Sequence, residues 1–278
     1  MAKPEVSAVV VTYNRPRLLL ECLDSLSRQS FQNFEIIVVD NGGNDLARKD
    51  ILSFDPLYLK MKNNIAVPIA RNVGSSFSNS KYVGFIDDDA VCDDNFVKIA
   101  INILNYRQDI IVVSGKICPK TKNIYNKIQS HYDLGDKPLI GYFREGCSFV
   151  RKEAWSDVSH YNDMVFRNGL MQGHEGIVVL YAIGKKYGAR SFLYEPSMII
   201  FHDFSSSFKH YLIKRKNHKQ ANFYYQKYFP ELANYIQNEH YFEKSNHILT
   251  KRTLIDKIKT KFINILTKIY LKFFITED

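Results

Sequence analysis

The sequence has few cysteines, and no two of them are close together. They are Cys22, Cys92, Cys118 and Cys147, and no C-x-x-C pair occurs. Because zinc sites and disulfide frameworks need closely spaced cysteines, neither is predicted. A reduced, cytoplasmic setting is the simpler expectation.

Long apolar runs are also missing. No apolar segment reaches the roughly 18 residues that a membrane-spanning helix needs. Nor does the opening, Met1-Ala2-Lys3-Pro4, show the basic segment followed by an apolar one that is typical of a secretory signal. We therefore expect a cytoplasmic protein without a transmembrane segment, and leave open a peripheral contact with the inner face of the cell membrane.

Acidic residues are in the minority. The 278 residues include 38 Lys and Arg against 29 Asp and Glu, a net charge of +9. This excess favours anionic partners, such as nucleotides, phospholipid surfaces or nucleic acid. With 45% hydrophobic and 24% charged residues, the chain has the composition of a folded protein, and its length suits one large α/β domain with an extension.

Apolar runs of strand length alternate with amphipathic runs of helix length over the first hundred residues. The first strand is expected at Val6 to Val11, a helix from Pro16 to Arg28, and the next strand at Glu35 to Val39. This alternation is typical of βαβ units, and it predicts an α/β fold with a mostly parallel central sheet flanked by helices. Further elements are expected at 57–61 (strand), 66–78 (helix) and 82–86 (strand).

Three consecutive acids follow the last of these strands. Asp87, Asp88 and Asp89 would repel one another, which raises the pKa of at least one carboxyl group unless a cation binds. Oxygen ligands of this kind suit Mg²⁺ or Mn²⁺. The alternative is a cap for the next helix, but Asp93 and Asp94 already supply one. A metal and phosphate site is therefore predicted.

A second polar turn, Asp40-Asn41-Gly42-Gly43-Asn44-Asp45, follows the strand that ends at Val39. Ligands of open α/β sheets bind at the carboxyl ends of the strands. We therefore expect the two carboxylate-bearing turns to converge on one ligand.

Four ordered stretches carry a family resemblance. They are Val-Val-Val-Thr-Tyr-Asn-Arg (9–15), Val-Val-Asp-Asn-Gly (38–42), Ala-Arg-Asn-Val-Gly (70–74) and Phe-Ile-Asp-Asp-Asp (85–89). Together, over roughly the first hundred residues, they resemble family 2 glycosyltransferases. The resemblance implies a GT-A fold and an inverting, Mn²⁺- or Mg²⁺-dependent transfer from a nucleotide diphosphate sugar, for which a UDP-sugar is our expectation.

The resemblance also implies roles for single residues. Asp40 becomes a nucleobase contact, and Asp87 and Asp89 become the D-x-D pair that contacts ribose, diphosphate and metal. Arg71 can add a charge-assisted hydrogen bond to a phosphate, or else be a solvated residue paired with a nearby acid. The ring of Tyr13 can line the nucleotide pocket or pack on the sheet edge. The expected nucleotide-sugar contacts are Thr12, Tyr13, Asn14, Asp40, Arg71, Asp87 and Asp88.

The catalytic base is expected in the second half of the chain. In the family, an acidic pair, usually Glu-Asp, opens a helix beneath the acceptor. The comparable stretch here contains His174, Glu175 and Gly176, so that the usual Asp is replaced by glycine. We expect Glu175 to be the base in a helix that stops at Gly188, with His174 as a second candidate. The alternative is that Glu175 is only a helix-start acid.

A histidine follows two short β-rich runs, 190–194 and 198–201, that are split by Glu195-Pro196. In many GT-A enzymes a histidine after the last strand completes the metal site, and neutral imidazole is a plausible Mn²⁺ ligand. The resemblance therefore implies Asp89, Asp87 and His202 as metal ligands. The alternative for His202 is a hydrogen-bonded structural residue.

The stretch 141–152 resembles the acceptor-side strand of the family. Gly146 in this stretch is expected to allow a sugar to approach closely. Cys147 is expected to be buried, because inverting transfer needs no nucleophile and no activating partner is identifiable.

We expect a GT-A catalytic domain at 1–204, with a nucleotide-sugar half at about 1–115 and an acceptor half at about 116–204. A helical extension is expected at 205–278. Its first part is rich in cations and aromatics, notably at 209–219. These cations can approach a diphosphate or an anionic acceptor. Nucleic acid is not an expected partner, because no recognised binding module accompanies the charge.

The last segment, 251–274, repeats apolar residues every three or four positions, with lysines between them. This pattern predicts a basic amphipathic helix of the kind that lies in an anionic membrane interface. Docking on the domain, or on a second copy in a homo-oligomer, explains the apolar stripe equally well.

The prediction is thus an inverting, metal-dependent glycosyltransferase that extends a surface polysaccharide or a lipid-linked oligosaccharide. The missing Glu-Asp pair motivates one alternative from another class. It is a non-catalytic nucleotide-binding or scaffold protein with the same fold.

Overall fold

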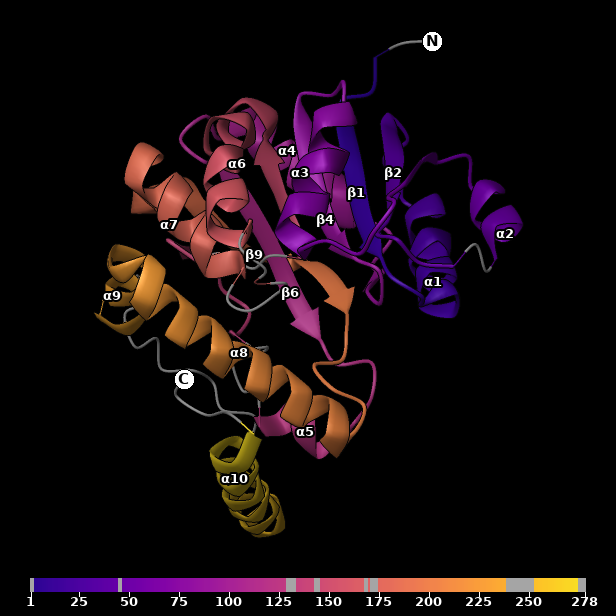
Figure 1. Ribbon diagram of the computed structural model, residues 1–278. Coiled ribbons are helices and arrows are strands. Elements are labelled where there is room, and N and C mark those ends of the chain that lie inside the picture. Colours follow the sequence, from indigo (N-terminus) through magenta and orange to yellow (C-terminus); the bar gives the residue numbers. More distant parts are fainter. Residues whose placement is uncertain are drawn as a thin grey trace.

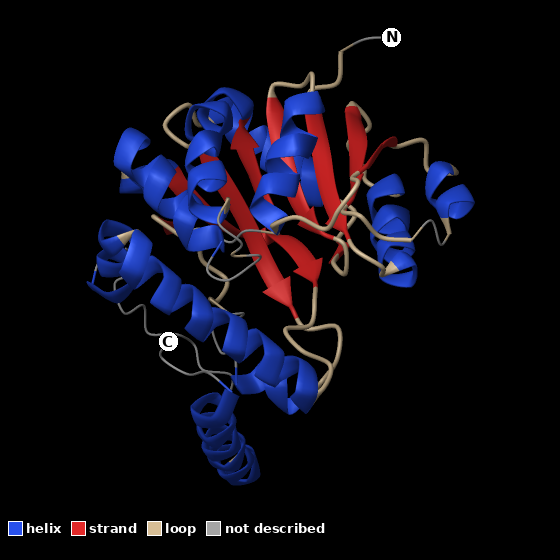
Figure 2. Ribbon diagram, in the orientation of Figure 1, coloured by secondary structure: helices blue, strands red, loops and turns tan. Residues whose placement is uncertain are grey.

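A nine-stranded sheet with helices on both faces forms the body of the molecule (Figures 1 and 2). The computed structural model describes residues 3–44, 47–128, 134–142, 146–167, 170, 175–238 and 253–274. The strands are β1 (Val6–Thr12), β2 (Phe34–Asp40), β3 (Leu57–Lys60), β4 (Tyr82–Asp87), β5 (Val91–Cys92), β6 (Val112–Cys118), β7 (Leu139–Ile140), β8 (Cys147–Arg151) and β9 (Phe192–Phe201). The α-helices are α1 (Pro16–Ser27), α2 (Arg48–Leu52), α3 (Val67–Phe77), α4 (Phe96–Tyr106), α5 (Ile124–Ile128), α6 (Lys152–Phe166), α7 (Glu175–Tyr187), α8 (Phe208–Tyr228), α9 (Pro230–Asn238) and α10 (Leu254–Phe274).

The two faces of the sheet are buried under different helices. In β1, Ala8 and Val10 point into a core that also contains Leu23 of α1 and Val97 of α4. Val9 points to the opposite core, which is formed with residues of α3, α6 and α7. Parallel strands are usually covered on both faces in this way, which explains why the predicted strands are almost wholly apolar.

The order of strands is β3-β2-β1-β4-β8-β6-β9-β5, with β7 paired to β9. The first four strands are parallel, as predicted. In their register, Thr12 lies opposite Asp40, and Val11 lies opposite Asp87. The turns after β1, β2 and β4 therefore lie at one edge of the sheet.

Antiparallel pairings begin at β8, which runs against both β4 and β6. The prediction of a mostly parallel sheet thus holds for β1 to β4, whereas the sheet as a whole contains both parallel and antiparallel pairs.

One strand prediction is wrong. The two runs 190–194 and 198–201 are not separate strands, because β9 continues through Glu195-Pro196. In the neighbouring strand β6, Gly115 pairs with Glu195 and the next residue, Lys116, pairs with Ile199. Strand β9 therefore has extra residues at this point. A bulge tolerates a proline, since the extra residues make no ladder hydrogen bonds.

The helices that follow β9 pack on the body of the molecule. Ala221 and Tyr225 of α8 share one core with Val165 of α6 and Val178 of α7. In Figure 1, α8 crosses below the sheet and α10 projects beyond α5 and α8. The predicted division at residue 204 stays a prediction. No described helix is both long and apolar enough to cross a membrane.

Candidate active site

Two carboxylates and one imidazole meet at the carboxyl edge of the sheet. Asp87 ends β4, Asp89 lies in the turn after it, and His202 directly follows β9. One ligand atom from each lies within 4.8 Å of the others. His202 Nε2 is 3.0 Å from Asp89 Oδ1. The structure therefore brings the three predicted metal ligands together, and this donor set suits Mn²⁺ or Mg²⁺. Their role as ligands stays a prediction.

The close pair Asp89–His202 is electrostatically favourable. Burial disfavours the charged form of both groups, but their mutual attraction outweighs it. It lowers the pKa of Asp89 and raises the pKa of His202. A bound cation would replace the imidazolium charge in this pair, since a metal ligand must be the neutral imidazole.

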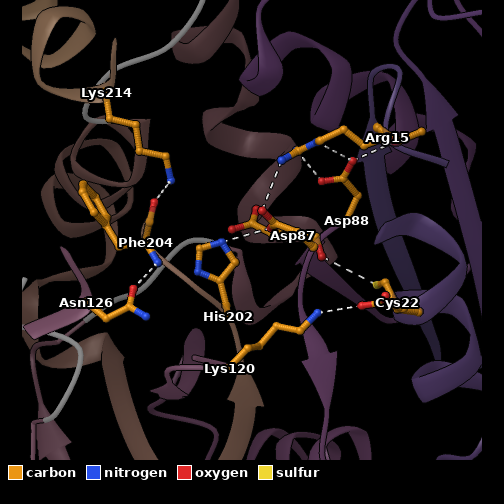
Figure 3. Close-up of polar contacts among 12 residues, drawn as sticks. Arg15, Cys22, Asp87, Asp88, Lys120, Asn126, His202, Phe204 and Lys214 are labelled. Atoms are coloured by element: carbon orange, nitrogen blue, oxygen red, sulfur yellow. Dashed lines mark hydrogen bonds and ion pairs between the residues drawn. The ribbon is translucent and has the colours of Figure 1, made fainter. Parts of the chain in front are cut away.

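Asp88 makes different contacts from its two neighbours. It is 1% exposed, and Thr12 Oγ1 donates to it at 2.7 Å. Arg15 donates through Nε at 3.1 Å and also through Nη2 (Figure 3). Burial raises the pKa of Asp88 to about 7, although Arg15 opposes the shift. Thr12 and Asp88, both predicted nucleotide contacts, thus contact each other; their nucleotide roles stay predictions.

Arg15 is a site residue that the sequence prediction missed. Besides Asp88, it contacts Asp89, with Nη1 at 3.1 Å from Oδ2. Burial opposes its charge, but the three carboxylates outweigh this and raise the pKa of Arg15. The residue stands in the stretch 9–15, which marks it as a candidate. No local pattern, however, indicates that its side chain reaches acids more than seventy positions away.

Arg71 is buried and paired with the site. Its Nη2 donates to Asp87 Oδ1 at 2.7 Å from helix α3. Of the two alternatives, the solvated residue does not describe it, because the side chain is 8% exposed. The guanidinium lies beside the group expected to bind metal and diphosphate, while its phosphate contact stays a prediction.

Gly146 lies against the carboxylate of Asp87 and adopts φ +81°. A β-carbon at this position would be 2.3 Å from Asp87 Oδ2. The backbone carbonyl of Gly146 also accepts from Asp87 N at 3.1 Å. The space that glycine leaves open therefore holds Asp87, where we expected room for a sugar. Cys147 beside it is buried, as predicted, and its Sγ donates to the carbonyl of Gly115.

Asp40, at the end of β2, is held by hydrogen bonds from residues of the next turn and of β3. It accepts from Gly43 N at 2.9 Å, Tyr58 OH at 2.5 Å and Lys60 Nζ at 2.8 Å. Burial acts to raise its pKa, but these hydrogen bonds and the ammonium charge lower it overall. Its contact with a nucleobase stays a prediction.

Two further predicted nucleotide contacts follow β1. Asn14, at φ +54°, accepts from Asn44 N at 2.7 Å and so ties the first turn to the second. Tyr13 is 44% exposed, which does not fit a ring packed on the sheet edge. Both roles stay predictions.

One of the two predicted bases lies at the start of α7. Glu175 is its first residue, while His174 lies outside the described residues. The charge of Lys214 in α8 is influenced both by this helix start and by the acids. Burial lowers the pKa of Lys214, and the carboxylates of Asp89, Asp87 and Glu175 oppose that shift. Lys214 is therefore within electrostatic range of both carboxylate groups.

Lys214 is held in place by the segment after β9. Its Nζ donates to the carbonyl of Phe204 at 2.5 Å and lies 4.7 Å from the centre of that ring (Figure 3). The cations of 209–219 are expected to approach a diphosphate or an anionic acceptor, and this stays a prediction. The helical pattern could not single out Lys214, because the run has lysines on several sides of the helix.

Comparison with known proteins gives a consistent result. The family model described as "Glycosyl transferase family 2" matches residues 7–173. An uncharacterised glycosyltransferase of Rickettsia prowazekii is 30% identical over 160 residues, which are 53% of this chain and 50% of that protein. The UDP-Glc:alpha-D-GlcNAc-diphosphoundecaprenol beta-1,3-glucosyltransferase WfgD of Escherichia coli is 25% identical over 170 residues, 53% of this chain and 66% of that protein. The chain thus spans about half the length of the first of these relatives.

A solved structure shows the same fold. S. aureus TarS 1–349 in complex with UDP matches with a TM-score of 0.57 and 17% identity, covering 92% of this chain and 77% of that one. At this identity the likeness concerns the fold alone. It confirms the expected GT-A architecture.

Proposed function

Because this chain belongs to glycosyl transferase family 2 and is a glycosyltransferase, we propose that it moves a sugar from a UDP-sugar to a glycan hydroxyl with inversion. The acceptor proposed is a lipid-linked oligosaccharide or a growing surface polysaccharide. The observation that carries the proposal is the meeting of Asp87, Asp89 and His202 beside basic side chains at the carboxyl edge of the sheet. UDP is supported by the names of the E. coli relative and of the TarS complex.

Transfer breaks the bond between the anomeric carbon and the diphosphate oxygen, and leaves negative charge on that oxygen. Arg71, which pairs with Asp87, and Lys214, which is within electrostatic range of Asp87 and Asp89, can both stabilise this charge. Preorganised cations act strongly here because they need no reorientation during the reaction. Asp87, Asp89 and His202 would hold Mn²⁺ or Mg²⁺, which supplies Lewis-acid stabilisation of the diphosphate.

The acceptor oxygen attacks from the face opposite the leaving group and gives up its proton. We assign proton removal to Glu175, which stands at the start of α7 and within electrostatic range of Lys214. A single displacement of this kind inverts the anomeric centre and uses no protein nucleophile. The burial of Cys147 is consistent with this route.

Donor binding is the first test. The melting temperature is measured with UDP, GDP, dTDP and CMP, each with and without Mn²⁺. A ligand at about 100 times its dissociation constant stabilises by about 2.7 kcal/mol. We expect a Mn²⁺-dependent shift with UDP that Asp89→Asn abolishes. The control is Asp94→Asn, an exposed acid five residues after Asp89 in the sequence, which should keep the shift. No shift with any nucleotide would reject the proposed donor.

The missing Glu-Asp pair favours a second candidate, a nucleotide-binding scaffold without activity. Glu175→Gln separates the two when UDP binding and sugar transfer are both measured. Retained UDP binding with lost transfer supports catalysis with Glu175 as base. Glu153→Gln is a matched control, because Glu153 also stands in the first turn of a helix, α6. Unchanged transfer by Glu175→Gln would exclude it as the base, and UDP binding without transfer in the wild type would favour the scaffold.

A further inference from the structure

Helix α10 exposes a continuous apolar stripe. Leu254, Ile258, Phe262, Ile265 and Ile269 follow one another at intervals of four or three residues, so they share one face of the helix. Each is 47% to 74% exposed. Exposed apolar residues are ordinary when scattered singly, but a contiguous stripe marks an interaction surface.

A different side of α10 attaches the helix to the molecule. Ile263 packs in one cluster with Phe204 and Tyr211, and Thr267 one turn further on is also buried. Asp256 on the same side pairs with Lys127 of α5 at 3.0 Å. The expected docking on the domain therefore occurs, but it leaves the apolar stripe uncovered by the described residues.

Lysines border the stripe. Lys257, Lys261, Lys268 and Lys272 are spaced by four, seven and four residues, which places them on one face, and all four are exposed. Asp256, the one acid within Leu254–Phe274, is turned toward α5. A hollow of about 410 Å³ on this lysine face is lined by Lys257, Thr260, Lys261, Asn264, Ile265 and Lys268. The ammonium groups of the lysines and the amide of Asn264 can donate to a phosphate group, while the hydroxyl of Thr260 donates to the carbonyl of Asp256.

We propose that α10 lies in the surface of an anionic phospholipid bilayer. The stripe would enter the boundary between headgroups and acyl chains, while the lysines meet lipid phosphates. A second copy of the chain fits less well, because pairing two such stripes would bring two rows of lysines to one interface. This docking does not depend on sugar transfer.

The attachment of α10 also relates the bilayer to the active site. Phe204, which packs with Ile263 of α10, is two residues from His202 and receives the hydrogen bond of Lys214. The helix that would rest on the bilayer thus shares a packing cluster with the segment that carries a predicted metal ligand. A lipid-linked acceptor would be presented at the same surface.

The test is cosedimentation of the full chain with phosphatidylglycerol vesicles and, separately, with phosphatidylcholine vesicles. We expect binding to the anionic vesicles that weakens as salt rises. In Lys257→Gln/Lys261→Gln/Lys268→Gln, the affinity should fall about fivefold for each lysine, or about a hundredfold in all. Ile258→Gln/Phe262→Gln should weaken binding by about tenfold or more, because two large apolar side chains would no longer be transferred from water into the bilayer.

The matched control is Phe77→Gln/Tyr106→Gln, which changes two exposed aromatic residues of α3 and α4 and should bind like the wild type. Glutamine is a good helix former, so all variants should fold. The UDP-induced melting shift, retained in each variant, verifies this and separates a failure here from a failure of the proposed donor. Equal binding to both vesicle types, or none to either, would overturn the proposal. So would self-association in solution that Ile258→Gln/Phe262→Gln abolishes.

Discussion

The turns after β2 and β4 both carry buried carboxylates, but they hold them in different ways. Asp40 is satisfied by Gly43, Tyr58 and Lys60, all within twenty residues of it. The acids after β4 depend on Arg15, Arg71 and His202, which come from three distant parts of the chain. The first arrangement can form with β2 and β3 alone. The second requires β1, β4, β9 and helix α3 to be in place together.

The two turns also differ in charge balance. At Asp40, hydrogen bonds and a neighbouring ammonium group outweigh burial, and the pKa is lowered. At Asp88, burial outweighs Arg15, and the pKa rises to about 7. The turn after β4 thus holds a carboxyl group whose charged form is disfavoured by burial, and Arg15 offsets only part of that cost.

Of the substitutions considered, removal of Arg15 should have the largest effect on stability, because it acts on the turn after β4. Arg15→Met leaves Asp88 buried without its guanidinium partner, and breaking a buried ion pair costs about 3–5 kcal/mol. Because the Arg15 side chain is 44% exposed, we expect a loss of about 2–3 kcal/mol in the free energy of unfolding. Urea denaturation measures it.

The double variant Arg15→Met/Asp88→Asn should recover most of that loss, since no uncompensated carboxylate remains. Arg17→Met is the control, because Arg17 is almost fully exposed and pairs with Glu21 along α1. If Arg15→Met and Arg17→Met were equally stable, Arg15 would not be the partner that balances the turn.

A methyl group at Gly146 should have the next largest effect. Gly146→Ala places a side chain at φ +81° and 2.3 Å from Asp87 Oδ2. The backbone conformation costs about 1 kcal/mol and the displacement of Asp87 adds a similar amount, so the total is about 2 kcal/mol. Mn²⁺-dependent UDP binding, measured by thermal shift, should weaken as well.

Gly188→Ala isolates the two contributions. Gly188 has φ +85°, but nothing lies within 4 Å of its expected β-carbon. The pair φ +85° and ψ 152° is a backbone conformation that residues with a β-carbon avoid. We therefore expect Gly188→Ala to lose about 1–3 kcal/mol of stability and to keep UDP binding unchanged. Equal UDP binding by the two alanine variants would mean that the position of Asp87 does not matter for the donor.

The smallest effect on stability is expected at the turn after β2. Lys60→Met should cost about 1 kcal/mol by urea denaturation, because Tyr58 and Gly43 still hold Asp40. In the wild type, the lowered pKa of Asp40 contributes stability above the ordinary value of 3.8. That contribution is lost as the pH falls through the lower, folded-state pKa. Lys60→Met should therefore lose less unfolding free energy than the wild type as the pH falls through this range. Lys62→Met, an exposed neighbour, serves as the reference, and an identical pH profile in both variants would contradict the assignment.

The parts of the site that the sequence predicted correctly come from the ends of apolar runs. The run before Asp87 and the run before Asp40 each indicate a strand, and the acids that follow must lie at its carboxyl end. The burial of β1 on both faces made these runs easy to recognise. His202 was placed through a resemblance rather than a periodic pattern.

What the sequence could not predict depends on contacts between distant residues. The reach of Arg15 to Asp89 and the packing of Asp87 on Gly146 appear only when separate strands are in register. Likewise, Glu195-Pro196 resembled a break between strands, because the bulge opposite Gly115 that accommodates it is a property of the pairing. The helix or strand propensity of a segment describes that segment alone and does not determine how it pairs with others.

The attachment of α10 has a consequence for how proteins of this kind diversify. The helix contacts the rest of the molecule through one side, at Ile263 and at Asp256, and none of the site residues named above belongs to it. If α10 lies on a bilayer as proposed, changes along its outer face would alter where the protein is held without touching those site residues. Selection for location and selection for substrate would then act on separate parts of the same chain.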